Sequence, residues 1–216
     1  MTKLNKYATL QGNFAGSSNP GVICSINYEE IQGPTKPLIH QAARFLYIKR
    51  GRGAIEISGV TYDVVPDMLI AITPWTITEV TSVTETFQLI RIVYDYQYIN
   101  TMLKGGFGLE EDSSELVHFL SREPAAYLDS AQSAYVDGIV EHLKAELGVE
   151  SNQISPPQQP LTHLYVSNKI VELMIMYRRY TMAVRGEKEY EKEIAVENSI
   201  LSYLYAHSAE RLTLAS

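Results

Sequence analysis

The stretch HQAARFLYIKRGRGAIEISGVTYDVVPDMLIAITP, from His40 to Pro74, decides the fold. It consists of short runs rich in β-branched and aromatic residues, which favour strands. Turn signals separate the runs, among them Gly51-Arg52-Gly53, which we interpret as a hairpin turn, and Gly59. Similar runs lie on both sides, so residues 21–98 hold seven or eight short strands without intervening helices. Such a series predicts a sandwich or a small barrel.

The pattern changes from strand-like to helical after about residue 100. Five apolar residues at helical spacing form one stripe: Val136, Ile139, Val140, Leu143 and Leu147. After the polar loop SNQISPPQQP, residues 162–184 form a second helical segment that is apolar on two faces. One stripe comprises Val166, Ile170, Leu173 and Tyr177, and the other comprises Leu164, Val171, Ile175 and Met182. We predict that the first stripe forms dimer contacts; the alternative is a helix sandwiched within its own domain.

Composition narrows the classes of function. The chain has 216 residues, of which 45% are hydrophobic, and this is enough for a sizeable core. Its formal net charge of -7 opposes DNA binding, because the positive field that attracts DNA is missing. A single cysteine, Cys24, excludes an intramolecular disulfide and a cysteine-based zinc site. With neither a signal core nor a window near the ~18 apolar residues of a membrane span, we expect a cytoplasmic protein.

The sequence offers no pattern typical of catalysis or of nucleotide binding. Gly51-Arg52-Gly53 lies between two predicted strands, and Gly105-Gly106-Phe107-Gly108 lacks the Lys-Ser/Thr of a phosphate loop. A Gly-x-Ser-x-Gly elbow is absent, and Cys24 has no histidine near it in sequence. We therefore predict a binding protein without a catalytic site or a cofactor.

The order of strands and turns from His40 to Pro74 resembles the core of a cupin jelly roll. In metal-dependent cupins this resemblance implies metal ligands at the positions that hold Leu38, His40, Arg44 and Thr78 here. His40 is the one potential ligand of the four, whereas a transition metal needs about three protein ligands. The resemblance therefore implies a cupin-like barrel whose metal site is lost.

Arg44 stands out among these positions. Alternation along the strand places it on the same face as Leu46 and Ile48, and the cupin register would direct it into the barrel. A buried guanidinium needs a counter-charge. We consider an internal carboxylate, Glu56 or Glu79, and alternatively an anionic or hydroxyl-rich ligand.

Side chains with aromatic faces and polar tips commonly line ligand sites. We expect a small-molecule pocket in the barrel, with Trp75 as its preferred residue because it follows Pro74 where such a barrel opens. The predicted pocket comprises His40, Arg44, Tyr47, Tyr62, Trp75 and Tyr94.

The last stretch, ILSYLYAHSAERLTLAS (200–216), resembles the opening of the AraC/XylS DNA-binding domain. Tyr203, Leu204, His207 and the run Leu212-Thr213-Leu214 occupy the matching places. Members of that family look like a degenerate cupin ligand-binding domain, a helical dimerisation segment and two helix-turn-helix motifs. The resemblance implies that both motifs lie beyond Ser216, so that this chain reads no DNA bases itself.

These observations predict an α+β fold in three parts. A cupin-like β-barrel (jelly roll) occupies residues 1–98, an antiparallel helical dimerisation segment with its linker occupies 99–190, and the first helix of a truncated helix-turn-helix domain occupies 191–216. The resemblance implies the effector-sensing region of a homodimeric AraC-family transcriptional regulator, in which an unknown small molecule modulates DNA binding. The alternatives are a small cupin enzyme of the isomerase or dioxygenase type and an interaction module without a ligand.

Overall fold

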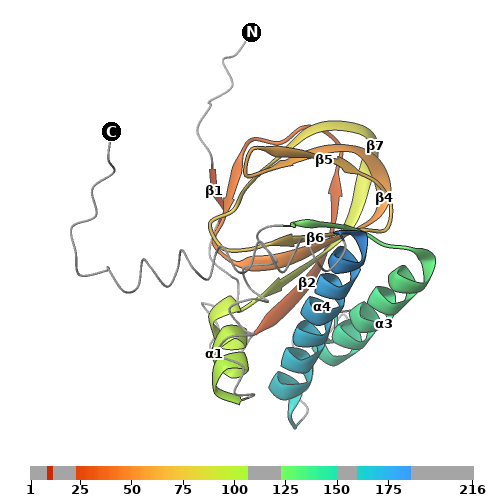
Figure 1. Ribbon diagram of the computed structural model, residues 1–216. Coiled ribbons are helices and arrows are strands. Elements are labelled where there is room, and N and C mark those ends of the chain that lie inside the picture. Colours follow the sequence, from red (N-terminus) through yellow and green to blue (C-terminus); the bar gives the residue numbers. More distant parts are fainter. Residues whose placement is uncertain (1–8, 12–22, 107–122, 150–159, 186–216) are drawn as a thin grey trace, which may run out of the picture. The chain divides into compact units, whose positions relative to one another are not determined.

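The computed structural model describes residues 9–11, 23–106, 123–149 and 160–185, and this part of the chain has an α+β fold (Figure 1). The chain divides into two compact units, residues 1–180 and 181–216, and all the elements named here except the end of the last helix belong to the first. In chain order they are β1 (Thr9–Gln11), β2 (Cys24–Ile31), β3 (Leu38–His40), β4 (Ala43–Ile57), β5 (Val60–Val64), β6 (Met68–Ile72), β7 (Ile77–Tyr94), α1 (Tyr96–Gly106), β8 (Ala125–Tyr127), α3 (Ser130–Leu147) and α4 (Thr162–Arg185).

Two long strands, β4 and β7, organise the sheet by pairing antiparallel along most of their length. The first half of β4 also pairs with β6, and its second half pairs with β5. The end of β7 pairs with β2, and its start pairs with β3. The long strands therefore run through two half-sheets, β2–β7–β4–β6–β8 and β1–β3–β7–β4–β5. The β-rich half predicted from the sequence is confirmed in this form.

The predicted hairpin turn at Gly51-Arg52-Gly53 is wrong, because these residues lie inside β4. The pairing of β4 with β7 shifts register several times between Ile48 and Ile55, which is how bulges bend a strand. Gly51 has a φ of 105°, and a Cβ there would lie 2.4 Å from the Thr86 carbonyl oxygen. The glycines are required for the bend of a continuous strand and not for a chain reversal.

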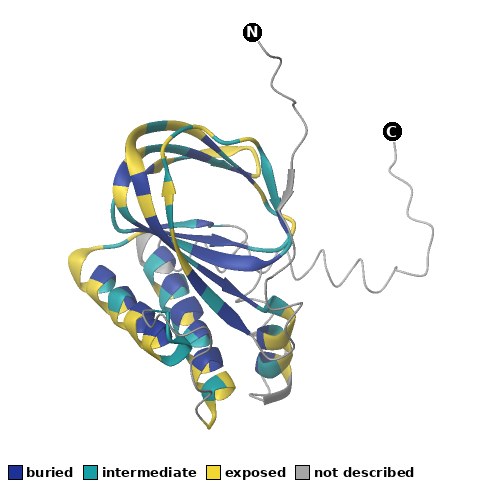
Figure 2. Cartoon of the chain, turned by 180° about the vertical axis from the view of Figure 1, so that it is seen from behind, coloured by how far each residue is buried: buried dark blue, intermediate teal, exposed yellow. Residues whose placement is uncertain are grey.

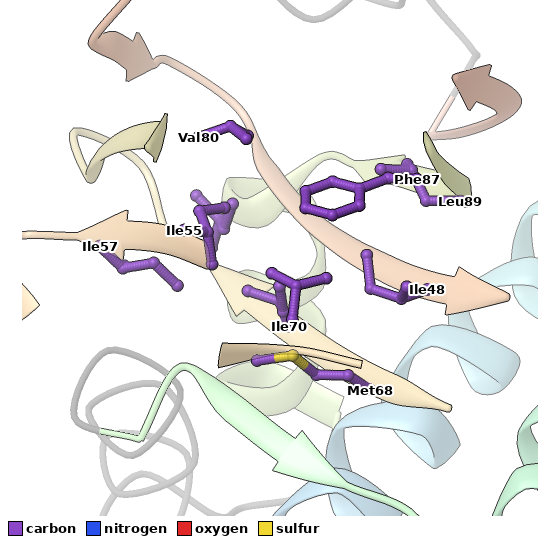
Figure 3. Close-up of a cluster of buried hydrophobic side chains, with 10 residues drawn as sticks. Ile48, Ile55, Ile57, Met68, Ile70, Val80, Phe87 and Leu89 are labelled. Atoms are coloured by element: carbon purple, nitrogen blue, oxygen red, sulfur yellow. The ribbon is translucent and has the colours of Figure 1, made fainter. Parts of the chain in front are cut away.

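One face of the sheet, which we call the inner face, carries the apolar core between the two half-sheets. Figure 3 shows its side chains directed toward one another from β4, β6 and β7. The cluster comprises Ile48, Ile55, Ile57, Val64, Met68, Ile70, Ile72, Val80, Phe87 and Leu89.

The opposite face of the half-sheet β2–β7–β4–β6–β8, which we call the helix face, is covered by α3 and α4. The ring of Phe45 stacks on Tyr94 with 5.7 Å between centroids and meets Tyr177 of α4 at 5.8 Å. On α3, Ser133 meets the hydroxyl of Tyr47 at 2.6 Å. Figure 2 shows buried residues on this part of the sheet and along both helices, where they alternate with exposed ones.

α3 and α4 lie side by side and run antiparallel (Figure 1). Tyr135 near the start of α3 donates to Glu172 well along α4, whereas Thr162 at the start of α4 donates to Glu146 at 2.5 Å. α3 begins with a capping box, in which the Asp129 carboxylate accepts from the backbone N–H of Gln132 at 2.8 Å.

The predicted dimer stripe on α4 is wrong as a contact surface. Its four members are fully buried within the single chain, so they have no surface to offer a second subunit: Val166, Ile170, Leu173 and Tyr177. The alternative, a helix packed within its own domain, describes this face. The second stripe of the helix is more open, with Leu164 51% exposed and Ile175 39% exposed.

The boundary predicted after residue 98 falls within α1. Beyond it, β8 joins the sheet by pairing with β6, so the strands and helices up to residue 180 belong to one compact unit. The predicted first helix of a DNA-binding domain, 191–216, lies outside the described residues. None of the helices in the described ranges is long and apolar enough to cross a membrane.

Candidate functional site: a polar cluster on the inner face

Beyond its apolar core, the inner face continues into a polar region. Cross-strand partners share a face. Leu46 is paired with Arg91, and the next inner pair is Ile48 with Leu89 in the core. Arg44 is paired with Ile72, which also belongs to the core. Both arginines therefore lie on the inner face, which is the side to which the cupin register would direct Arg44.

Five polar residues form what we call the inner polar cluster: Glu29, His40, Arg44, Thr78 and Arg91. Arg91 Nη1 lies 2.5 Å from Glu29 Oε1 in an ion pair between β7 and β2. His40 Nε2 and Thr78 Oγ1 are 2.6 Å apart in a hydrogen bond between β3 and β7. Arg44 Nε donates to the Ala42 carbonyl at 3.3 Å.

The electrostatics of His40 and Arg44 connect the two pairs. Burial, together with the positive charges of Arg44 and Arg91, lowers the pKa of His40 to about 3. Burial and the charge of Arg91 lower the pKa of Arg44 to about 10, while the Glu29 carboxylate acts in the opposite direction. At neutral pH Arg44 is therefore charged and His40 is neutral.

Two buried nitrogen atoms of the cluster have no hydrogen-bond partner within the described part of the chain, His40 Nδ1 and Arg91 Nε. Buried polar groups nearly always have a hydrogen-bond partner, so two unpaired nitrogen atoms in one cluster need an explanation. Arg44 is only 4% exposed. With two positive charges and one negative charge, Arg44, Arg91 and Glu29 carry a sum of +1 in an otherwise acidic chain. Guanidinium groups of this kind suit carboxylates and phosphates.

The four positions at which the resemblance implies cupin metal ligands do come together. Leu38 is paired with Thr78, His40 bonds Thr78, and Arg44 acts electrostatically on His40. They do not fit a metal, because leucine cannot ligate and the Arg44 guanidinium would repel a cation. Within the described ranges, no group of three or more His, Cys, Asp or Glu side chains could hold a metal ion.

The structure separates the six predicted pocket residues. His40 and Arg44 belong to the inner polar cluster, and Tyr62 packs against the apolar core on the same face. Tyr47 and Tyr94 lie on the helix face, where Tyr47 bonds Ser133. Their assignment to an inner pocket is wrong, because each is an odd number of residues away from the inner positions of its strand.

Trp75 does not belong to a buried pocket, since it is 69% exposed. In the turn between β6 and β7 its backbone has a φ of 69°, which residues other than glycine rarely adopt. Its backbone N–H donates to the His40 carbonyl at 2.6 Å. Trp75 therefore lies beside the cluster without being part of it.

The predicted counter-charges of Arg44 are also wrong. Glu56 and Glu79 are paired across β4 and β7, and each alternates with residues of the apolar core, so both lie on the outer side of the sheet. The carboxylate that acts on Arg44 is Glu29, which the sequence reasoning missed together with Arg91. A signal for Arg91 was present, because it continues the alternation of Phe87 and Leu89.

Comparison with known proteins assigns no family: neither a protein-family model nor a curated protein matches the chain. Among solved structures, the EutQ protein of Clostridium difficile is 20% identical with a TM-score of 0.31, over 38% of this chain and 62% of its own length, which is less than two thirds. A cupin 2 conserved barrel domain protein from Rhodopseudomonas palustris is 17% identical with a TM-score of 0.31, over 46% of this chain and 73% of its own. The Cnp3 cupin domain of Schizosaccharomyces pombe is 9% identical with a TM-score of 0.34, over 40% of this chain and 66% of its own length. Values this low carry no conclusion on function.

Proposed function

We propose that this chain is the effector-sensing region of an AraC-type transcriptional regulator and that its small-molecule effector binds at the inner polar cluster. The observation that carries the proposal is a buried arginine, Arg44, beside a second arginine with an unpaired Nε atom, on the inner face of the sheet. The unpaired Nε atom of Arg91 is a buried donor, and leaving such a donor without a partner costs free energy in the folded chain. A polar ligand would offset that cost when it binds.

The proposal treats the protein as a binding module and not as an enzyme. A general base works best with a pKa near the operating pH. Burial and two arginines hold the pKa of His40 at about 3, so its neutral ring is a poor proton acceptor near pH 7. An enzyme of the metal-dependent cupin type would carry one tightly bound iron, manganese or zinc ion per chain. Elemental analysis of the purified protein tests this alternative.

A homodimer is part of the proposal, with the second, exposed stripe of α4 as its contact surface. Leu164 and Ile175 are the exposed apolar residues of this stripe within the described residues. Ile175→Asp is expected to halve the mass measured by sedimentation equilibrium while leaving the thermal unfolding of the chain nearly unchanged. A chain that is monomeric before substitution, or a dimer that survives it, would contradict this contact surface.

The DNA-binding half of the proposal rests on the resemblance of residues 200–216 to the start of an AraC/XylS DNA-binding domain. It is tested on the gene. A reading frame that continues past Ser216 for roughly eighty residues, with two helix-turn-helix patterns and a basic balance, is expected. A stop codon directly after Ser216 would remove DNA binding from the function of this chain.

The effector-binding half is tested by a thermal-unfolding screen against small metabolites, with two variants of β4. Arg44→Met removes the buried charge and keeps a long side chain, and circular dichroism checks that the variant is folded. Arg50→Met, on the same strand but exposed, is the matched control. A metabolite that raises the melting temperature of the wild type and of Arg50→Met, but not that of Arg44→Met, supports the proposal. Equal shifts in all three proteins would place the ligand elsewhere, and no shift with any metabolite would favour a module without a ligand.

A further inference from the structure

One part of the sheet surface is not covered by any helix of the described residues. On the half-sheet β2–β7–β4–β6–β8, the side that faces away from the apolar core is covered by α3 and α4 (Figure 1). On the half-sheet β1–β3–β7–β4–β5, the corresponding side is open, and Figure 2 shows exposed residues there. We call this open side the acidic outer face. Strand pairing and alternation place six side chains on it: Ile39, Glu56, Thr61, Asp63, Ile77 and Glu79.

The acidic outer face carries three carboxylates. Glu56 is the direct cross-strand partner of Glu79 on β7 and of Thr61 on β5, and Asp63 lies two residues beyond Thr61. Like charges directly opposite one another in a sheet repel. Within the described part of the chain, none of the three carboxylates forms an ion pair. A partner with positive charges would therefore relieve this repulsion.

The same face has an apolar end. Ile77 is 45% exposed and pairs with Ile39, and Trp75, two residues before Ile77, is the exposed residue of the turn. The backbone bonds between the two segments continue beyond Ile77, because the N–H of His40 donates to the Thr76 carbonyl at 3.0 Å. Trp75 therefore adjoins the end of the face that Ile39 and Ile77 form. Adjoining exposed apolar residues are typical of interaction sites, whereas single ones are ordinary.

Trp75 is presented by a braced turn. The hydroxyl oxygens of Thr73 and Thr76 are 3.0 Å apart in a hydrogen bond, and the Thr76 N–H donates to the Thr73 carbonyl at 3.3 Å. At the positive φ of Trp75, glycine is free of strain and a tryptophan is not. Since most of the indole is exposed, packing within the chain does not account for a tryptophan here. A contact with a partner would account for it.

We propose that the acidic outer face, with Trp75 at its end, binds a basic amphipathic helix of another protein. A helix suits the face of a sheet because its apolar stripe packs against it, whereas an added strand needs a sheet edge. The apolar stripe covers Trp75 and Ile77, and lysine or arginine beside the stripe meets the three carboxylates. Nucleic acid and anionic lipid are disfavoured, because a negative face repels them. The proposal does not depend on a ligand in the inner polar cluster.

The test titrates the whole chain with a helical peptide of about 14 residues, in which leucines at helical spacing are flanked by lysines. Calorimetry gives the dissociation constant. Trp75 is the only tryptophan of the chain, so its fluorescence reports on binding at this face. We expect binding together with a blue shift of the emission. A peptide with glutamate in place of lysine is expected not to bind, and a peptide of the same composition without an apolar stripe is expected to bind more weakly.

Two double variants locate the contact. Glu56→Gln combined with Glu79→Gln is expected to raise the dissociation constant about 5-fold, because exposed charge pairs contribute modestly. Glu30→Gln combined with Glu85→Gln is the matched control. It makes the same change in net charge at exposed glutamates elsewhere, on β2 and on the part of β7 opposite Arg52, and should leave binding nearly unchanged.

Trp75→Gly separates a binding role from a structural one. Glycine adopts a φ of 69° without strain, so we expect little change in urea unfolding but a dissociation constant about 10-fold higher. Ile77→Ser removes the second exposed apolar residue and keeps the test valid if Trp75→Gly does not fold. Circular dichroism checks the fold of each variant.

Equal effects of the two double variants would assign the binding to the net charge of the chain and overturn the proposal. The same holds if the peptide without a stripe binds as tightly, if the emission of Trp75 does not change on binding, or if folded Trp75→Gly and Ile77→Ser bind like the wild type. A lower mass of Trp75→Gly than of the wild type in sedimentation equilibrium would place a second copy of this chain on the face and overturn the choice of partner. None of these outcomes bears on effector binding at the inner polar cluster, so the two proposals fail separately.

Discussion

Because His40 is neutral in the folded protein, we expect the free energy of unfolding to depend on pH. Burial, Arg44 and Arg91 lower its pKa from 6.5 to about 3 in the folded protein. Between these two values the unfolded chain binds a proton that the folded chain does not. The folded state is therefore favoured in full above about pH 6.5, and stability is lost as the pH falls toward 3. A pH of 5 lies about 1.5 units below the pKa of the histidine in the unfolded chain. This corresponds to a loss of about 2 kcal/mol of unfolding free energy.

The assay is urea unfolding at pH 8 and at pH 5, for the wild type and for His40→Gln. The amide of glutamine can bond Thr78 as the ring does, but it does not titrate. The difference in unfolding free energy between the two proteins should change by about 2 kcal/mol between the two pH values, in the direction that favours the variant at pH 5. His142→Gln, at an exposed position on α3, is the matched histidine control. Parallel pH profiles for the wild type and His40→Gln would refute the reasoning, because they would mean that His40 titrates equally in the folded and unfolded chain.

Three further predictions concern the packing that supports the site. Gly51→Ala should lose more unfolding free energy in urea than Gly59→Ala, because both have positive φ but only at Gly51 would a Cβ lie 2.4 Å from a backbone oxygen of β7; equal losses would contradict this. Leu173→Ala should cost about 2–5 kcal/mol in the same assay and Leu164→Ala well under that, because the first is fully buried and the second is half exposed; similar costs would place Leu173 at a surface. Tyr47→Phe should cost about 1 kcal/mol, because it removes the hydroxyl that bonds α3, and a neutral substitution would show that this bond adds nothing.

Elements that depend on local periodicity could be predicted from the sequence. Features that depend on contacts between distant parts of the chain could not. The change from strand to helix near residue 100 follows from spacing, and so does the shared face of Arg44 and Ile48. That this face is the inner one was expected from the resemblance and not from spacing. Gly51-Arg52-Gly53 of β4 was misread as a hairpin turn because glycine is typical both of a bent strand and of a turn. What distinguishes them is the crowding of Gly51 against β7, about 35 residues later, which no local pattern contains.

Of the candidate site, the sequence indicated only the residues that a local pattern can identify. His40 and Arg44 were found because they stand at positions where a barrel of the expected kind has its ligands. Arg91 and Glu29 come from β7 and β2, and their pairing depends on the register between those strands. Tyr47 was misplaced because a tyrosine suits a pocket and a helix contact equally well, and a single step along a strand decides between them.

The strand β4 gives a physical route from the site to the helices. Its consecutive residues face opposite sides: Arg44 lies in the inner polar cluster, and Phe45 packs on Tyr177 of α4. The hydroxyl of Tyr47 then bonds Ser133 of α3 at 2.6 Å. Under the proposed function, a ligand that shifts the backbone at Arg44 would therefore act on the same strand on which both helices pack. For this route to transmit a signal, the ligand must bind one arrangement of β4 and the helices more tightly than another.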